Sequence, residues 1–237
     1  MEEFIRIAAL LGQENFNKLQ NSTVAVFGIG GVGGAAAEAL IRSGVGTIHA
    51  FDSDTVAVSN LNRQAVAFKG TVGKSKTLVL KEMANEISDS VTVIPHEVFY
   101  SPETADEIDL TQFDFIIDAI DTVTCKTELI ARASEKGVPI ISVMGTANKL
   151  DPLKLTVTDI YKTEGCPLAR AMRTALKKRG VKKLTVIYST ETPIKAEDFG
   201  EYRQTGRPCP ASAVFVPAAA GLIAAQNAVK YLTKLRP

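Results

Sequence analysis

The sequence predicts an α/β protein with a mainly parallel sheet, helices on both faces of that sheet, and a C-terminal antiparallel extension. Short apolar segments alternate with helical segments between residues 23 and 143. This order favours a parallel sheet, because each crossover helix returns the chain to the same sheet edge. From residue 153 to residue 158 apolar and polar residues alternate, which is typical of a half-exposed antiparallel strand.

The first expected element is a helix over residues 3–20. Phe4, Ile7, Leu10 and Leu11 recur at helical spacing, so we expect them to share one face of this helix.

Strands and helices then alternate along the chain. In the first part we expect strands at residues 23–27, 47–51, 91–94, 113–118 and 139–143. We expect the connecting helices at residues 32–43, 74–87, 102–108 and 124–136. The remaining chain is predicted to add strands at 153–158 and 184–188 and helices at 167–179 and 217–232. The loop over residues 53–72 is long for a compact fold, which indicates a functional segment.

Length and composition exclude several classes of protein. A chain of 237 residues can bury one sizeable core, and we expect a single domain over residues 1–237. A net charge of +1 means that any affinity for nucleic acid must come from a local patch. No stretch is long and apolar enough to cross a membrane, and the acidic N-terminus lacks a secretory pattern, so we expect a cytoplasmic protein. Three cysteines without a Cys-x-x-Cys pair exclude a four-thiolate zinc site.

A glycine-rich turn follows the first strand. Gly28, Gly30, Gly31 and Gly33 lie between this strand and the next helix, where glycine lets phosphates approach the backbone and the helix N-terminus offers free N–H groups. Asp52 ends the second strand about 20 residues later, a position suited to a ribose hydroxyl. The pattern is Rossmann-like and predicts a nucleotide site. By itself it is compatible with a nicotinamide dinucleotide.

Cationic side chains downstream favour ATP over a nicotinamide dinucleotide. Arg63 lies in the long loop, and Lys74 and Lys76 lie at the start of the next helix. Displacement at the α-phosphate of ATP needs several cations, because charge on the phosphoryl oxygens must be stabilised in the transition state. The alternative interpretation is that Lys74 and Lys76 are solvated lysines at a helix start.

Two carboxylates follow the fourth strand. Asp118 and Asp121 lie at the carboxyl edge of the sheet, where open α/β sheets bind ligands. One carboxylate there suits Mg²⁺ shared with substrate phosphates. Asp121, just past the strand, is the better candidate, whereas Asp118 is placed to cap or anchor the loop.

These motifs together resemble the ThiF and MoeB family, whose adenylation fold is similar to that of ubiquitin-activating enzymes. The resemblance covers residues 5–145 and rests on four segments: Gly28-x-Gly30-Gly31-Val32-Gly33, the run from Asp52 to Gln64, Gly73-Lys74-x-Lys76, and Asp118-Ala119-Ile120-Asp121. It implies that residues 1–150 form the nucleotide-binding part and residues 151–237 the substrate side.

The family resemblance also implies roles for single residues. The glycine turn would bind ATP, and Asp52 would hold its ribose. Phosphates would be bound by Asn60, Arg63 and Lys76, and Mg²⁺ by Asp121. The family forms homodimers in which an arginine enters the neighbour's ATP site, and Arg6 lies at the matching place.

The C-terminal third resembles the branch of the family that dehydrates threonylcarbamoyladenosine in tRNA. The matching runs are Asp151 to Thr163, Pro167 to Arg173, Tyr188 to Pro193 and Phe215 to Leu222. This resemblance implies ATP-dependent cyclisation of the threonylcarbamoyl carboxylate on the adenosine next to the anticodon.

Other functions remain open on the sequence alone. The first alternative is an adenylyltransferase for the C-terminal Gly-Gly of a ubiquitin-like sulfur carrier, although this chain lacks the paired cysteines usual there. The second is a non-catalytic nucleotide-binding scaffold. A monovalent cation, a sulfur-transfer partner and a redox role for Cys166 or Cys209 also stay open. We expect His49 and His96 to be packed rather than catalytic.

A basic segment is the candidate tRNA contact. Between residues 170 and 183 the chain has seven cations and no acidic residue: Arg170, Arg173, Lys177, Lys178, Arg179, Lys182 and Lys183. Leu168, Met172 and Leu176 recur on the opposite stripe of the expected helix. Such clustering in a nearly neutral chain favours phosphate contact. The alternative is a solvated helix face whose cations favour the C-terminal dipole.

Overall fold

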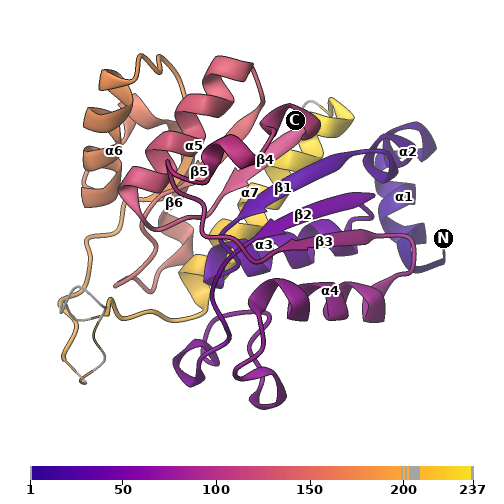
Figure 1. Cartoon of the computed structure of the whole chain (residues 1–237), viewed down its shortest axis with the longest axis horizontal. Helices are drawn as coiled ribbons and strands as arrows, with labels where there is room; N and C mark the ends of the chain where they lie inside the picture. Colours follow the sequence, from indigo (N-terminus) through magenta and orange to yellow (C-terminus); the bar gives the residue numbers. More distant parts are fainter. Residues whose placement is uncertain (1, 199, 201, 203–208, 236–237) are drawn as a thin grey trace.

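A sheet of seven strands forms the centre of the molecule within the described residues, 2–198, 200, 202 and 209–235, of this computed structural model (Figure 1). The strands are β1 (Thr23–Phe27), β2 (Thr47–Phe51), β3 (Thr92–His96), β4 (Phe115–Asp118), β5 (Ile140–Val143), β6 (Leu155–Asp159) and β7 (Thr185–Ser189). Their order is β3-β2-β1-β4-β5-β7-β6, and within it β6 pairs with β7 in antiparallel fashion while the other pairs are parallel. The predicted fold class is confirmed.

Helices cover both faces of this sheet (Figure 1). They are α1 (Ile5–Leu11), α2 (Gln13–Gln20), α3 (Gly31–Arg42), α4 (Lys76–Ile87), α5 (Val123–Lys136), α6 (Pro167–Lys178) and α7 (Phe215–Thr233). One hydrophobic core joins α3, α4 and α7 to the sheet, and two others join it to α5 and α6. Strand β1 contributes Val24 and Val26 to the first core and Ala25 and Phe27 to the second, as expected for a strand buried on both faces.

The N-terminal helix is interrupted, contrary to the continuous helix predicted over residues 3–20. Gly12 separates α1 from α2 with φ +80°, a left-handed conformation that glycine adopts without strain. The predicted common face is also wrong, because Phe4 is 2% exposed and Leu10 is 82% exposed. Phe4 packs against Phe16 of α2, so the break lets the two short helices fold over the same core.

A second correction concerns residues 102–108, which do not form the predicted helix. Only the three residues Ala105–Glu107 form a short 3-10 turn. Thr104 accepts the N–H of Ser101 and donates to the carbonyl of Phe99. These side-chain bonds compete with a helical backbone pattern in this segment. The other expected elements lie within a few residues of their predicted bounds.

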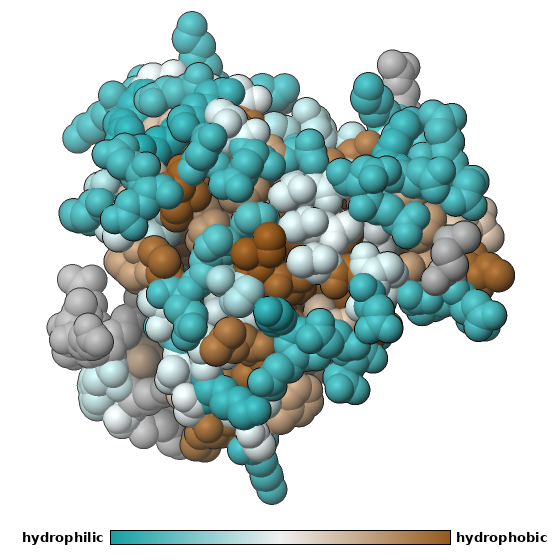
Figure 2. Space-filling view, turned by 45° about the vertical axis from the view of Figure 1, so that its right-hand side comes forward, coloured by the Kyte–Doolittle hydropathy of each residue, from teal (hydrophilic) through white to brown (hydrophobic). Residues whose placement is uncertain are grey.

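Among the described residues, no helix combines the length and the apolar character that crossing a bilayer requires. Figure 2 shows hydrophobic side chains in small patches, separated by hydrophilic ones, on the face that it displays.

The strand order reverses between β1 and β4. Chain connections leave the carboxyl ends of these two strands toward opposite faces, so a crevice opens between them. The glycine turn after β1 and Asp121, just past β4, both lie at this crevice.

Candidate functional site

A cavity of about 1010 Å³ lies at the crevice between β1 and β4. Its wall is built from the glycine turn, the long loop after β2, the β4–α5 loop, the segment after β5 and the chain that enters α7. The predicted site residues that line it are Gly28, Gly30, Gly31, Asp52, Asn60, Arg63, Lys76 and Asp121. Residues from four segments distant in sequence therefore converge on one hollow.

The glycine turn needs glycine at two positions for different steric reasons. Gly28 has φ +89°, and a Cβ there would lie 2.9 Å from the carbonyl oxygen of Ala119. A Cβ on Gly33 would lie only 1.7 Å from the carbonyl oxygen of Gly28. Gly33 therefore packs α3 against the turn and does not line the cavity. At Gly30, by contrast, the nearest atom to such a Cβ is 4.0 Å away, so this position faces open space.

Asp52 braces the glycine turn. One of its oxygens accepts the N–H of Ile29 at 2.6 Å, and the other accepts the N–H of Asp54 at 2.8 Å. Burial raises the pKa of the Asp52 carboxyl, while Lys76 and the two N–H groups oppose that shift. The Asp52 carboxylate, directly after β2, thus holds the backbone of the glycine turn in place.

Lys76 is buried at the start of α4. Its side chain is 6% exposed, and its Nζ lies 2.7 Å from Asp54 and 3.8 Å from Asp52. The side chain of Lys74 is 51% exposed and pairs with Glu82. The solvated-lysine interpretation is therefore right for Lys74 and wrong for Lys76.

The loop after β2 is ordered by its own side chains. Asn60 is 9% exposed and accepts the N–H of Ala57 through its side-chain oxygen at 3.1 Å. Arg63 donates from Nη1 to the carbonyl of Ser59 and to Asn62. Asn60 and Arg63 both line the cavity. The cavity thus combines a helix N-terminus with two cationic side chains, a set of donors that is complementary to a polyphosphate.

Asp118, the last residue of β4, and Asp121, just past it, differ in burial. Asp118 is 0% exposed and bonds to Ser142, Lys126 and the N–H of Ile120, as expected for a loop anchor. Asp121 is exposed at the cavity wall, and Thr122 Oγ1 donates to it at 3.2 Å.

The donor set around Asp121 fits a metal that arrives with a nucleotide. No group of three or more His, Cys, Asp or Glu residues able to hold a metal ion occurs in the part of the chain that the structure describes. Mg²⁺ is commonly held by one or two carboxylates together with substrate phosphates and water. One carboxylate beside a cavity rich in cationic donors meets that requirement.

Several cavity residues were missed by sequence reasoning. Gln64, Glu197, Asp198 and Cys209 line the hollow, as does the segment from 143 to 147. Glu197, Asp198 and Cys209 follow the last predicted strand in a stretch with no helical or strand periodicity, so no spacing in the sequence indicates that they line the cavity. Cys209 thus lies at the cavity, whereas Cys166 is buried at the start of α6.

A smaller recess of about 100 Å³ lies beside Asp52. Val98, Phe99 and Tyr100 line it together with the backbone of the glycine turn and the β4–α5 loop. Tyr100 also packs edge-on against Phe27 of β1. Apolar side chains line part of the recess, and Asp52 and Asp121 line another part.

Arg6 and the cations of the basic segment do not line the cavity. Arg6 is an exposed residue of α1. On α6, Arg170, Lys177 and Lys178 are exposed, whereas Arg173 donates to Thr163. Arg179, which is exposed just after the helix, forms a 2.6 Å ion pair with Glu128. Arg179 lowers the pKa of the Glu128 carboxyl. The buried stripe is confirmed for Met172 and Leu176, which are 0% exposed, while Leu168 is half-buried at the cavity.

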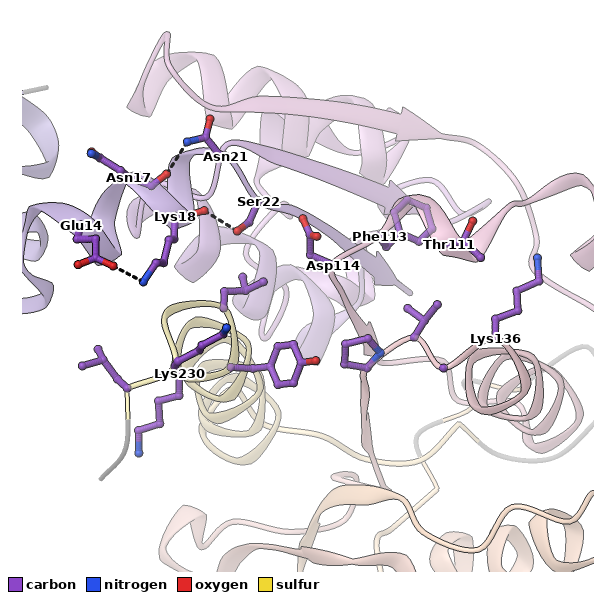
Figure 3. Close-up of a pocket in the computed structure, with 17 residues that line it drawn as sticks. Glu14, Asn17, Lys18, Asn21, Ser22, Thr111, Phe113, Asp114, Lys136 and Lys230 are labelled. Atoms are coloured by element: carbon purple, nitrogen blue, oxygen red, sulfur yellow. Dashed lines mark hydrogen bonds and ion pairs between the residues drawn. The ribbon is translucent and has the colours of Figure 1, made fainter.

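A hollow of about 1170 Å³ lies at the opposite edge of the sheet. Figure 3 shows Lys18 of α2 and Lys136 of α5 on opposite sides of this hollow. Lys18 pairs with Glu14 at 2.8 Å and Lys136 with Asp109 at 3.3 Å. Parallel strands begin at this edge, whereas ligands of open α/β sheets bind where strands end, so we assign the functional site to the cavity at the carboxyl edge.

Comparison with known proteins agrees with this geometry. Residues 4–237 match the sequence model of the ThiF family. A tRNA threonylcarbamoyladenosine dehydratase of Bacillus subtilis is 41% identical, and the alignment covers 99% of this chain and 96% of that protein. The crystal structure of the Escherichia coli dehydratase TcdA in complex with ATP has a TM-score of 0.89 and 31% identity, and covers 98% of this chain and 94% of that chain.

Proposed function

The chain belongs to the ThiF family, and from this membership we propose that it uses ATP to dehydrate N6-threonylcarbamoyladenosine next to the anticodon of a tRNA. The observation that carries the proposal is the convergence of the α3 N-terminus, Lys76, Arg63 and Asp121 on one cavity. The full-length similarity to named tRNA threonylcarbamoyladenosine dehydratases supports the choice of substrate.

Activation of the carboxylate is the first step. A carboxylate oxygen of the threonylcarbamoyl group attacks the α-phosphate of ATP, and pyrophosphate leaves with the electrons of the broken P–O bond. Lys76, Arg63 and Asn60 hold the phosphoryl oxygens, and Asp52 holds the ribose. The small recess beside Asp52 takes the adenine. Such fixed donors stabilise the transition state because they need no reorganisation during the reaction.

Ring closure is the second step. The carbamoyl oxygen attacks the acyl carbon, the carbamoyl nitrogen loses its proton, and AMP leaves. Carboxylate and carbamoyl group belong to the same side chain, and this proximity supplies the effective concentration that an enzyme thiol would otherwise provide. Cys166 is buried and has no place in these steps.

Asp121 would hold a Mg²⁺ ion that enters with ATP. When bound, the ion neutralises charge on the phosphate oxygens. The protein's own contribution is to keep the Asp121 carboxylate at the cavity wall beside Lys76 and the glycine turn.

The tRNA lies over residues 151–237 in this proposal, while residues 1–150 hold the nucleotide. Helix α6 begins at the cavity, where Leu168 lines the wall, and it carries the exposed cations Arg170, Lys177 and Lys178 away from it. Phosphates of the anticodon arm contact these cations while the modified base enters the cavity. A tRNA substrate also places the reaction in the cytoplasm.

The active form is a homodimer in which Arg6 of each subunit enters the ATP site of the other. The exposure of Arg6 on α1 and its absence from its own cavity support this arrangement. Mixing the variants Arg6→Ala and Lys76→Met tests it. A mixed dimer has one site with both residues intact, so activity should return, whereas each variant alone stays inactive. If the mixture is as inactive as its components, Arg6 does not act across the interface.

Release of AMP and pyrophosphate on defined substrates tests the reaction itself. The purified chain with Mg·ATP should release both products in equal amounts when given tRNA that carries threonylcarbamoyladenosine. It should release neither with unmodified tRNA. Transfer of AMP to the Gly-Gly terminus of a ubiquitin-like carrier, with no response to tRNA, would instead establish the sulfur-carrier alternative.

A further inference from the structure

A buried ion pair joins the ends of β4 and β5 behind the cavity. The side chains of Asp118 and Lys126 are both 0% exposed, and Lys126 Nζ lies 2.9 Å from Asp118 Oδ2. The same Nζ donates to the carbonyl of Val143 at 2.9 Å, and Ser142 Oγ donates to Asp118 at 2.6 Å. The Lys126 ammonium group thus bonds to the last residue of β4 and to the last residue of β5.

The same two residues hold the loop that carries Asp121 at both of its ends. Asp118 Oδ1 accepts the N–H of Ile120 at 3.1 Å. The N–H of Lys126 donates to the carbonyl of Thr122 at 2.9 Å, in the first turn of α5. Ile120 and Asp121 line the cavity between these two anchoring points.

Val143 continues the connection to another wall of the cavity. It ends β5, and the segment that follows, up to Ala147, lines the hollow and leads into the C-terminal part of the chain. Neither Asp118 nor Lys126 lines the cavity itself. Any effect that they have on a ligand must therefore pass through the loops that they hold.

A contribution to folding stability does not explain why the Asp118–Lys126 ion pair is so deeply buried. The desolvation of two charges offsets most of their attraction, and well-packed apolar side chains of similar volume stabilise a fold as well or better. Removing one partner alone leaves an uncompensated charge inside the protein. A buried ion pair can instead fix the positions of the two loops that face the ligand.

We propose that Asp118 and Lys126 are positioning residues that hold Asp121 and the 143–147 segment at the mutual spacing needed to bind Mg·ATP. This inference rests on the proposed function. Asp121 and the 143–147 segment line the cavity from two different loops. The ion pair therefore couples two walls of the nucleotide cavity.

A double variant separates positioning from stability. Asp118→Asn together with Lys126→Met removes both charges, keeps the side-chain sizes close, and leaves no unpaired charge. Leu19→Ala is the matched control, because Leu19 is 0% exposed and belongs to α2, at the opposite edge of the sheet. Thermal unfolding reports stability, and calorimetry with ATP in Mg²⁺ or in EDTA reports binding.

The double variant should unfold near the wild-type temperature and bind Mg·ATP roughly tenfold or more weakly, the usual effect of losing an outer-shell partner of a metal site. Its affinity for ATP in EDTA should be unchanged. The control should unfold at a lower temperature but bind Mg·ATP like the wild type. If the double variant does not fold, Ser142→Ala, which removes one hydrogen bond between β5 and Asp118 and leaves both charges paired, should show the same selective loss in smaller measure.

Two results would overturn the inference, and they are distinguishable. Wild-type affinity for Mg·ATP in a folded double variant limits the pair to a structural role and leaves the proposed function intact. A wild-type chain that does not bind ATP at all contradicts the proposed function, and the positioning role with it.

Discussion

Lys76 and Asp54 form a 2.7 Å ion pair in which the lysine side chain is 6% exposed and the aspartate side chain 69% exposed. The ammonium is thus held at the cavity wall by a partner that stands in solvent. An ion pair with one partner in solvent is weakened, since water screens the charge of that partner. We therefore expect the phosphates of a nucleotide to compete successfully with Asp54 for this ammonium group.

Lys76→Met should abolish adenylation. The variant keeps the length of the side chain but removes the charge that holds the phosphoryl oxygens, and loss of one such group lowers turnover by about 100-fold or more. Lys74→Met is the control, because Lys74 is half exposed and pairs with Glu82 outside the cavity. The rate of pyrophosphate release measures the adenylation activity of both variants. Equal activity of the two variants would contradict the role of Lys76.

Two glycines should separate folding from nucleotide binding. Gly33→Ala places a methyl group 1.7 Å from a backbone oxygen, and we expect it to destabilise the fold by about 3 kcal/mol through overpacking. Gly30→Ala meets no atom closer than 4.0 Å, so the fold should persist while the methyl group obstructs the approach of phosphates. Urea unfolding and ATP calorimetry measure the two effects. Full ATP affinity in a folded Gly30→Ala variant would show that the phosphates do not lie against the turn.

Helix α6 should determine how tRNA binding depends on salt. Arg170→Ala and Lys177→Ala remove exposed cations, and each lost phosphate contact should reduce the slope of log affinity against log salt by about 1. Lys81→Ala, on the exposed face of α4, should leave the slope unchanged. Arg173 and Arg179 are unsuitable for this test, because they bond to Thr163 and Glu128 and their loss would disturb the fold. An unchanged slope in both α6 variants would argue that α6 is a solvated helix face.

The histidine pair should make folding stability depend on pH. His49 Nδ1 lies 2.9 Å from His96 Nε2, and burial lowers the pKa of both side chains. A pKa below that of the unfolded chain, about 6.5, means that the unfolded state binds more protons. The stability contribution is then fully present above about pH 6.5 and is lost as the pH falls through the folded-state pKa values. Urea unfolding between about pH 5 and 8 should show this decline, and His96→Gln should make it shallower. A decline of equal slope in the variant would assign the effect to other groups.

The sequence was sufficient for the parts of the structure that local patterns determine. Buried strands, the glycine turn and Asp52 at the end of β2 each have a signal within a few residues. The buried stripe of Met172 and Leu176 follows from helical spacing alone.

The rest depends on partners distant in the chain. Lys76 is buried because Asp52 and Asp54 stand beside it, and nothing near residue 76 indicates this. The apolar residues keep their helical spacing past Gly12, so the spacing does not indicate a break after α1. The break becomes evident only in the structure, where Phe4 packs against Phe16. Glu197 and Asp198 reach the cavity through the path of a loop that has no periodic pattern.

Mass spectrometry of tRNA nucleosides measures the proposed dehydration itself. The purified chain is incubated with Mg·ATP and tRNA that carries threonylcarbamoyladenosine, and the nucleosides are analysed under conditions that preserve the cyclic product. The wild type should convert this nucleoside to a form lighter by one water, and Lys76→Met should not. An unchanged nucleoside, with the wild-type chain folded and ATP bound, would contradict a dehydratase activity.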